Sequence, residues 1–135
     1  MRAAIFLATT LLMLPWVAAA QDGPNKVGPL VGTWENEGFS VTYFAEGFAI
    51  PVSKSGDTAL GALEASVSGE QLSLRNLTAP NGATPESTRC SMTSDGVYQF
   101  QIDDGVLTMQ ALNDPCADRA ASVSSFVMER VSTTP

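Results

Sequence analysis

Residues 28–44, GPLVGTWENEGFSVTYF, decide the fold that we expect for this chain. Apolar and polar side chains alternate in two short runs, and this period of two is the pattern of half-buried β-strands. The Asn36–Gly38 segment between the runs supplies residues that favour turns. The residues that share one face are Leu30, Gly32 and Trp34 in the first run and Phe39, Val41, Tyr43 and Ala45 in the second. The stretch therefore predicts two neighbouring antiparallel strands at the start of an all-β domain.

Short alternating runs continue along the rest of the chain and bring the expected number of strands to about eight. The further runs cover 47–52, 63–67, 71–75, 97–102, 106–112 and 122–131. Asp103–Gly105 predicts a tight hairpin, because Asp-Gly tolerates the positive φ angles that such turns need. Thr78–Thr88 is expected to form a long surface loop, and Ala117–Ala121 is the one place where a helical turn could form.

An antiparallel chain of this length must either pack two sheets or close into a barrel. Closure into a barrel leaves no exposed strand edges. We therefore expect an all-β fold, an up-and-down barrel of about eight antiparallel strands, in one domain over residues 29–135.

The first 28 residues do not fit the barrel pattern. Residues 1–20 combine a basic start, an apolar run from Ala3 to Val17 and the small residues Ala18–Ala20. This is the pattern of a secretory signal peptide that is removed before Gln21. Gln21–Gly28 is polar with Gly and Pro, which predicts a flexible N-terminal arm. We therefore expect a secreted or periplasmic protein.

Charge and cysteine content narrow the possible partners. After removal of the predicted signal peptide, six basic and fourteen acidic side chains remain in 115 residues. Such an acidic chain is repelled by phosphate backbones, so nucleic acid is excluded as a partner. Cys90 and Cys116 favour one disulfide in an exported protein, with two free thiols as the alternative. The bond would close a loop of about 25 residues and stabilise the fold by roughly 3 kcal/mol.

The residue types argue against catalysis and against a metal site. The chain contains no histidine, the commonest general base and the commonest metal ligand. The aspartates that could approach one another in turns, Asp103, Asp104, Asp114 and Asp118, lack calcium-loop spacing. Turn stabilisation by these side chains is the favoured interpretation. We therefore expect no enzymatic activity, no cofactor and no metal.

The segment LVGTWEN resembles the G-x-W opening of lipocalin-like (calycin-type) barrels. The resemblance implies that Trp34 closes one end of the barrel and that a basic side chain from the last strand packs across its face. Arg130 matches that position, since it has the same parity as Phe126 and Met128. The ending NDPCADRAASVSSFVMERV is also similar to that of small secreted bacterial lipocalin-like proteins of unassigned function.

Inward-facing aromatic and methionine side chains define the candidate ligand cavity. They are Tyr43, Phe100, Met109, Phe126 and Met128. The default site in a barrel is such a cavity, and its ligand would be a small apolar molecule. A filled or nearly filled core is nevertheless the favoured interpretation of these positions, because eight short strands leave little room.

Three hypotheses for the function follow. The first is an exported binding protein for a small apolar molecule. The second is a barrel that inhibits or binds an envelope or secreted protein through the arm 21–28 and the loop 78–88. The third is a purely structural envelope protein. The oligomeric state does not follow from the sequence.

Overall fold

The computed structural model describes residues 24–55, 58–59 and 61–135. The predicted signal peptide, residues 1–20, and residues 21–23 of the predicted arm lie outside the described residues. Within the described ranges, no helix is both long enough and apolar enough to cross a membrane.

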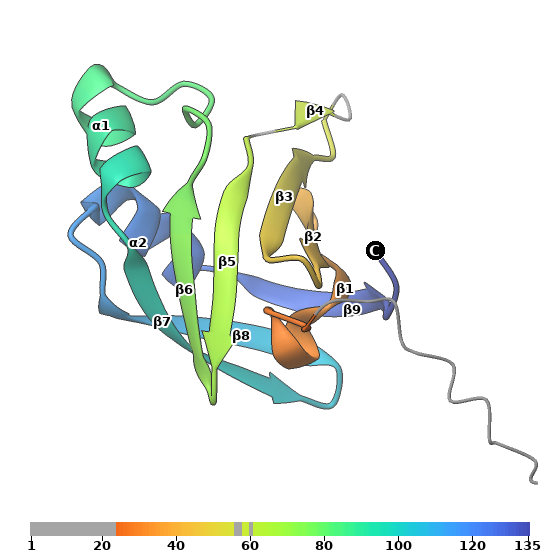
Figure 1. Ribbon diagram of the computed structural model, residues 1–135. Coiled ribbons are helices and arrows are strands. Elements are labelled where there is room, and N and C mark those ends of the chain that lie inside the picture. The colour runs from red at the N-terminus through yellow and green to blue at the C-terminus, as the bar shows by residue number, and fades with distance from the viewer. Residues whose placement is uncertain (1–23, 56–57, 60) are drawn as a thin grey trace, which may run out of the picture.

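Eight antiparallel strands form a closed barrel, which confirms the predicted fold (Figure 1). The chain order is η1 (Gly28–Leu30), β1 (Gly32–Glu35), β2 (Phe39–Phe44), β3 (Phe48–Ser53), β4 (Thr58–Ala59), β5 (Leu63–Ser68), β6 (Gln71–Asn76), α1 (Pro85–Thr93), β7 (Gly96–Asp103), β8 (Val106–Asn113), α2 (Ala117–Ser124) and β9 (Val127–Ser132). Each barrel strand pairs with its neighbours in the chain, and β1 pairs with both β2 and β9 to close the ring. The two-residue β4 only extends the edge of β3.

The alternation read from the sequence sets which side chains enter the barrel. Trp34 lies opposite Val41, Tyr43 opposite Ala49, and Phe100 opposite Met109 across strand pairs, and all six are buried. Because side chains in a strand alternate between faces, these buried pairs fix the register of the strands that carry them. The predicted hairpin is also present: Asp104 and Gly105, both at positive φ, join β7 to β8.

One end of the barrel is closed around Trp34. Its side chain is fully buried, and its indole Nε1–H donates to the Leu30 carbonyl at 2.9 Å. The Arg130 guanidinium lies 4.1 Å from the centre of the indole ring. It also donates to the carbonyls of Val31 at 3.0 Å and Pro29 at 2.7 Å. Arg130 thus packs across the Trp34 ring at the position expected from the sequence, and Pro29 of η1 and the following Val31 supply the carbonyl groups that bind its guanidinium.

The prediction of a flexible arm is wrong for its last residues. Val27 is fully buried. The Lys26 amide donates to the Ala45 carbonyl at 2.8 Å, and the Lys26 carbonyl accepts from the Val67 amide at 2.7 Å. The segment is thus bound to the turn after β2 and to β5.

The predicted loop 78–88 ends earlier than expected, because α1 begins at Pro85. Thr84 is the N-cap, and its Oγ1 accepts from the Ser87 amide at 3.2 Å. Proline in the first turn and Glu86 beside it both favour a helix start. The sequence TPES therefore carried a helix signal that the Gly and Pro content of the segment obscured.

The last predicted strand also begins too early. α2 covers Ala117–Ser124, more than the single turn expected, and β9 starts at Val127 instead of Ser122. Phe126 therefore lies between helix and strand, where its ring packs edge-on against Phe39 at 4.5 Å.

The predicted disulfide is present and joins the two helices. Cys90 lies in α1, and Cys116 is the residue before α2, with their Cα atoms 5.7 Å apart. Figure 1 shows α1 and α2 on the same flank of the barrel. The bond therefore fixes two helices that no strand pairing holds together.

Replacing the end-cap indole tests the closed end. Trp34→Ala should lower the free energy of unfolding by about 3–5 kcal/mol, because a fully buried aromatic side chain is lost. Phe48→Ala is the control, since Phe48 is 43% exposed and its loss should cost less than about 1 kcal/mol. Urea unfolding followed by circular dichroism measures both, and equal small losses would contradict the role of Trp34.

Candidate functional site

A cavity of about 480 Å³ opens at the end of the barrel opposite η1. β3 pairs with β5 through only two residue pairs, Phe48 with Glu64 and Ala49 with Leu63, both at the start of β3. The last residues of β3, Val52 and Ser53, pair with the short β4 instead. After Ala49, β3 therefore has no further partner in β5, and the barrel wall is interrupted there. The interior widens towards the loop that leads into α1.

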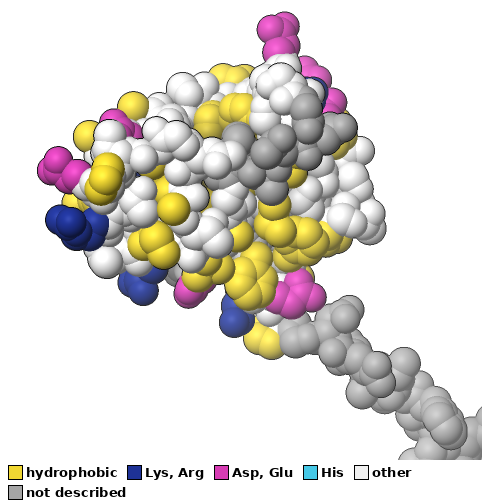
Figure 2. Space-filling model, turned by 90° about the horizontal axis from the view of Figure 1, so that it is seen from above, with side chains coloured by type: hydrophobic (Ala, Val, Ile, Leu, Met, Phe, Trp, Pro, Cys, Tyr) yellow, Lys and Arg dark blue, Asp and Glu magenta, His cyan; other side chains and the backbone are white. Residues whose placement is uncertain are grey.

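The walls of the cavity are mostly apolar. The strands contribute Phe39, Val41, Tyr43, Ala49, Pro51, Leu63 and Leu74, and the segment from α2 to β9 contributes Val123 and Phe126. Pro80 and Ala83 of the loop before α1 lie at the same cavity. Figure 2 looks onto this end of the barrel, where hydrophobic side chains occupy the middle of the view and charged ones lie towards its margins. Such a surface favours an apolar ligand.

A few polar side chains interrupt the apolar wall. Asn76 from β6, Ser91 from α1 and Arg119 from α2 all line the cavity and are buried. Burial of polar groups is unfavourable unless their hydrogen bonds are satisfied, so their partners decide what they can offer to a ligand.

Every N–H group of Arg119 is used within the protein. Nε donates to Asp114 Oδ2 at 2.8 Å, and Nη2 donates to Asp114 Oδ1 at 2.9 Å. Nη2 also donates to the Ser94 carbonyl at 2.9 Å. Nη1 donates to the Ser91 carbonyl at 3.0 Å and to Asn76 Oδ1 at 3.4 Å. These five bonds match the five N–H donors of a guanidinium. Arg119 therefore holds α1, α2 and β6 together.

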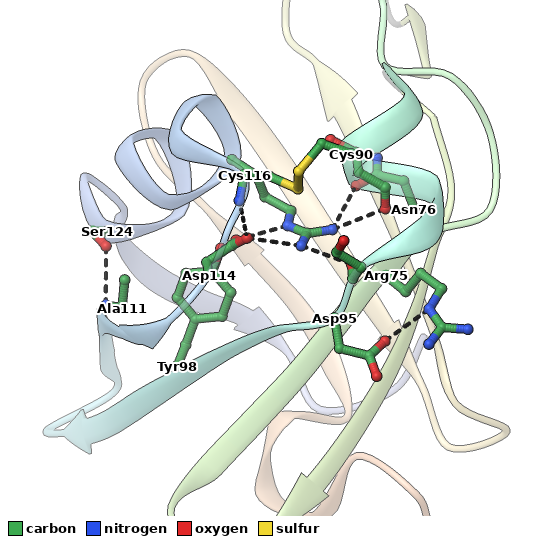
Figure 3. A network of polar contacts seen from close by, with 12 residues as sticks. Arg75, Asn76, Cys90, Asp95, Tyr98, Ala111, Asp114, Cys116 and Ser124 are labelled. Carbon is green, nitrogen blue, oxygen red and sulfur yellow. Dashed lines mark hydrogen bonds and ion pairs between the residues drawn. A yellow bond between two sulfur atoms is a disulfide. The ribbon is translucent and has the colours of Figure 1, made fainter. Parts of the chain in front are cut away.

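Asp114 is the counter-ion at the centre of this network (Figure 3). Its side chain is fully buried, and it also accepts from the Tyr98 hydroxyl and, at 2.9 Å, from the Cys116 amide. Burial alone would raise the pKa of Asp114, but the hydrogen bonds from Arg119, Tyr98 and Cys116 outweigh it and lower the pKa. Burial alone would lower the pKa of Arg119, but Asp114 raises it. Both groups therefore stay charged.

The strand beside Asp114 leaves room for its carboxylate. A Cβ atom on Gly96 would lie 2.7 Å from Asp114 Cγ and 2.9 Å from Tyr98 Cε2. These approaches are too close for any side chain, so Gly96 is required at the start of β7.

Two of the five predicted cavity residues, Tyr43 and Phe126, line the cavity. Phe100, Met109 and Met128 are buried in the packed core and do not line it, so their assignment to the cavity is corrected. Parity in a strand predicts which face a side chain takes, but not its height along the barrel axis. The expected filled core holds for the half of the barrel that contains Met128 and is wrong for the half beneath α1.

The Asp114–Arg119 pair was not predicted from the sequence, which led us to expect Asp114 to be a turn residue. The only signal was an acidic and a basic residue five positions apart, next to a cysteine. In the described part of the chain, no three acidic, histidine or cysteine side chains come together as a possible metal site.

Comparisons with known proteins add no family assignment. No protein-family model, curated protein sequence or solved structure matches this chain. The lipocalin-like resemblance therefore rests on the closed barrel and on the Trp34–Arg130 pair.

Removing one partner of the buried ion pair should be costly. Asp114→Asn leaves the Arg119 charge uncompensated, and we expect a loss of about 3–5 kcal/mol in the free energy of unfolding. Asp95→Asn is the matched control, because Asp95 forms a half-exposed ion pair with Arg75. The control should lose less than about 1 kcal/mol. Similar losses for both variants in urea unfolding would contradict a structural role for the buried pair.

The same pair predicts a loss of stability in acid. The pKa of Asp114 in the folded protein lies below its ordinary value of 3.8, so the unfolded chain takes up the proton first. The stabilisation is therefore complete above that ordinary value and is lost as the pH falls through and below it. Thermal melting across this range should show a steeper acid loss in the wild type than in Asp114→Asn. Parallel pH profiles would show that Asp114 contributes nothing.

Proposed function

We propose that the protein is an exported, lipocalin-like, non-enzymatic binding protein for a small, largely apolar molecule. The observation that carries the proposal is the open apolar cavity of about 480 Å³. Its size lies within the range of about 300–1,000 Å³ that is typical of small-molecule sites. The absence of histidine from the sequence supports binding over catalysis.

The links between the two helices beside the cavity support a preformed binding site. α1 and α2 are joined by the Cys90–Cys116 disulfide and by the buried Arg119–Asp114 pair. A cavity whose walls are already fixed loses little conformational entropy when a ligand enters, which favours binding.

The Cys90–Cys116 disulfide supports export, and the Trp34–Arg130 pair supports the lipocalin-like assignment. Structural disulfides persist in oxidising compartments such as the periplasm or the extracellular space. The Trp34–Arg130 contact at 4.1 Å matches what the family resemblance implies for the closed end of the barrel.

The alternative, an inhibitor that uses an N-terminal arm and the loop 78–88, has less support. Val27 is buried and the Lys26 backbone is bonded to Ala45 and Val67, so this part of the arm does not protrude. Pro80 and Ala83 of the loop before α1 line the cavity, so part of this loop belongs to the proposed small-molecule site.

Native mass spectrometry of the protein purified gently from its source is the direct test of the proposal. We expect an additional mass of a few hundred daltons that is lost on denaturation. A neutral fluorescent apolar probe, N-phenyl-1-naphthylamine, then reports on the cavity with recombinant protein.

A pair of neighbouring substitutions locates the binding. Ser122 lines the cavity and Ala121 does not, although both are exposed residues of α2. Ser122→Trp should weaken binding of the probe at least about tenfold, because the indole enters the cavity. Ala121→Trp should leave the affinity unchanged. Unchanged probe affinity in both variants would place binding outside this cavity and contradict the proposal.

A further inference from the structure

We propose that the cavity selects uncharged ligands that carry a hydrogen-bond acceptor beside an apolar body, and that it rejects ionised carboxylates. This inference rests on the proposed function, because it names the class of ligand that the same cavity binds.

Arg119 offers no free positive group to an anion. It is the one basic side chain among the described residues that line the cavity. Its five N–H groups are occupied by Asp114, Asn76, Ser91 and Ser94. A carboxylate could bind to it only by displacing one of these partners, and the Asp114 carboxylate already neutralises the guanidinium with two matched hydrogen bonds. The cavity therefore has a cation in its wall without a binding site for an anion.

Asn76 supplies a free donor at the same place. Asn76 is 8% exposed, and its Oδ1 accepts from Arg119 Nη1, which orients the amide so that Nδ2 points away from the arginine. The Nδ2 group donates to no described residue. No buried side-chain nitrogen or oxygen in the described part of the chain lacks a partner. Because Nδ2 has no partner among the described residues, it is not one of the fully buried atoms. The Asn76 side chain lines the cavity, so we infer that a ligand in the cavity can reach Nδ2.

Ser91 and Tyr43 add two neutral hydroxyl groups. Ser91 is 2% exposed, lines the cavity and lies beside Asn76, since both contact Arg119 Nη1. Tyr43 lies on the strand wall, and its hydroxyl donates to no other described residue. Burial raises the pKa of Tyr43, so the hydroxyl stays neutral. The buried polar side chains that line the cavity and do not belong to the ion pair, Asn76, Ser91 and Tyr43, therefore carry no charge, and the Asn76 amide nitrogen can only donate.

The surrounding charge disfavours an anion further. Asp118 is an exposed acidic residue that lines the cavity, and the whole chain has a formal charge of −7. An ionised carboxylate that enters would lose its hydration without gaining a free cation, which is strongly unfavourable. A ketone, ester or ether oxygen loses less on leaving water and finds the Asn76 donor.

Competition between two matched compounds tests the inference. Methyl decanoate and decanoate carry the same acyl chain and differ in the charge of the head, which is ionised in decanoate at about pH 8. Displacement of N-phenyl-1-naphthylamine from the full chain should show binding of the ester at least about tenfold tighter than that of the carboxylate.

A substitution at Asn76 tests the donor itself. Asn76→Asp keeps the size of the side chain and the oxygen that faces Arg119, but replaces the amide donor with a charged acceptor. We expect ester affinity to fall at least about tenfold. Asn113→Asp adds the same charge at an exposed position outside the cavity and should leave ester affinity unchanged. Equal ester affinity in Asn76→Asp and the wild type would overturn the assignment of Asn76 as the donor.

The outcomes separate the two proposals. Decanoate binding as tightly as the ester, or displacement of the probe by neither compound, overturns the selectivity inference and leaves apolar binding in place. Failure of the probe and of both compounds to bind overturns the proposed function and the inference with it. Tighter binding of the ester by the wild type, lost only in Asn76→Asp, supports both.

Discussion

The buried ion pair between Arg119 and Asp114 is the constraint on which the open end of the barrel depends. A charged guanidinium inside a protein is tolerated only when its charge and all its donors are matched. Asp114 provides the charge, and the backbone of α1 and the Asn76 side chain provide the remaining acceptors. The hydrogen bonds from Arg119 of α2 therefore help to fix the position of α1, and the Cys90–Cys116 disulfide is a second link between the two helices.

The two ends of the barrel use an arginine in different ways. At the closed end, Arg130 lies over the Trp34 ring and binds carbonyls of η1, so the cation covers an apolar plug. At the open end, Arg119 lies in the cavity wall and is bound to Asp114, to the Asn76 side chain and to the carbonyls of Ser91 and Ser94. The Trp34 indole fills the closed end, whereas the Arg119 network lies in the wall of the cavity at the open end. This difference explains how eight short strands can contain both a packed core and a cavity.

The strands were predictable from the sequence because a period of two depends on local side-chain order alone. Trp34, Tyr43 and Phe100 took the inward face that their parity predicted. The pairing of Trp34 with Arg130 needed the family resemblance as well. The position of each inward residue along the barrel axis depends on strand stagger, which no single strand encodes. Phe100 and Met128 were therefore assigned to a cavity from which they are absent.

The helices and the ion pair were harder to predict, because their stability comes from tertiary contacts. α1 and α2 are short, and helices of this length are marginal on their own. Their residues become helical where Arg119 and the disulfide hold them against the barrel. Replacement of the Arg119 network by apolar side chains of similar volume could preserve stability, as buried ion pairs often allow. Such side chains need no partners from α1, so they would no longer hold that helix away from the interior, nor orient the Asn76 amide towards it. The network is therefore better explained by the shape and polarity of the cavity than by the stability of the fold.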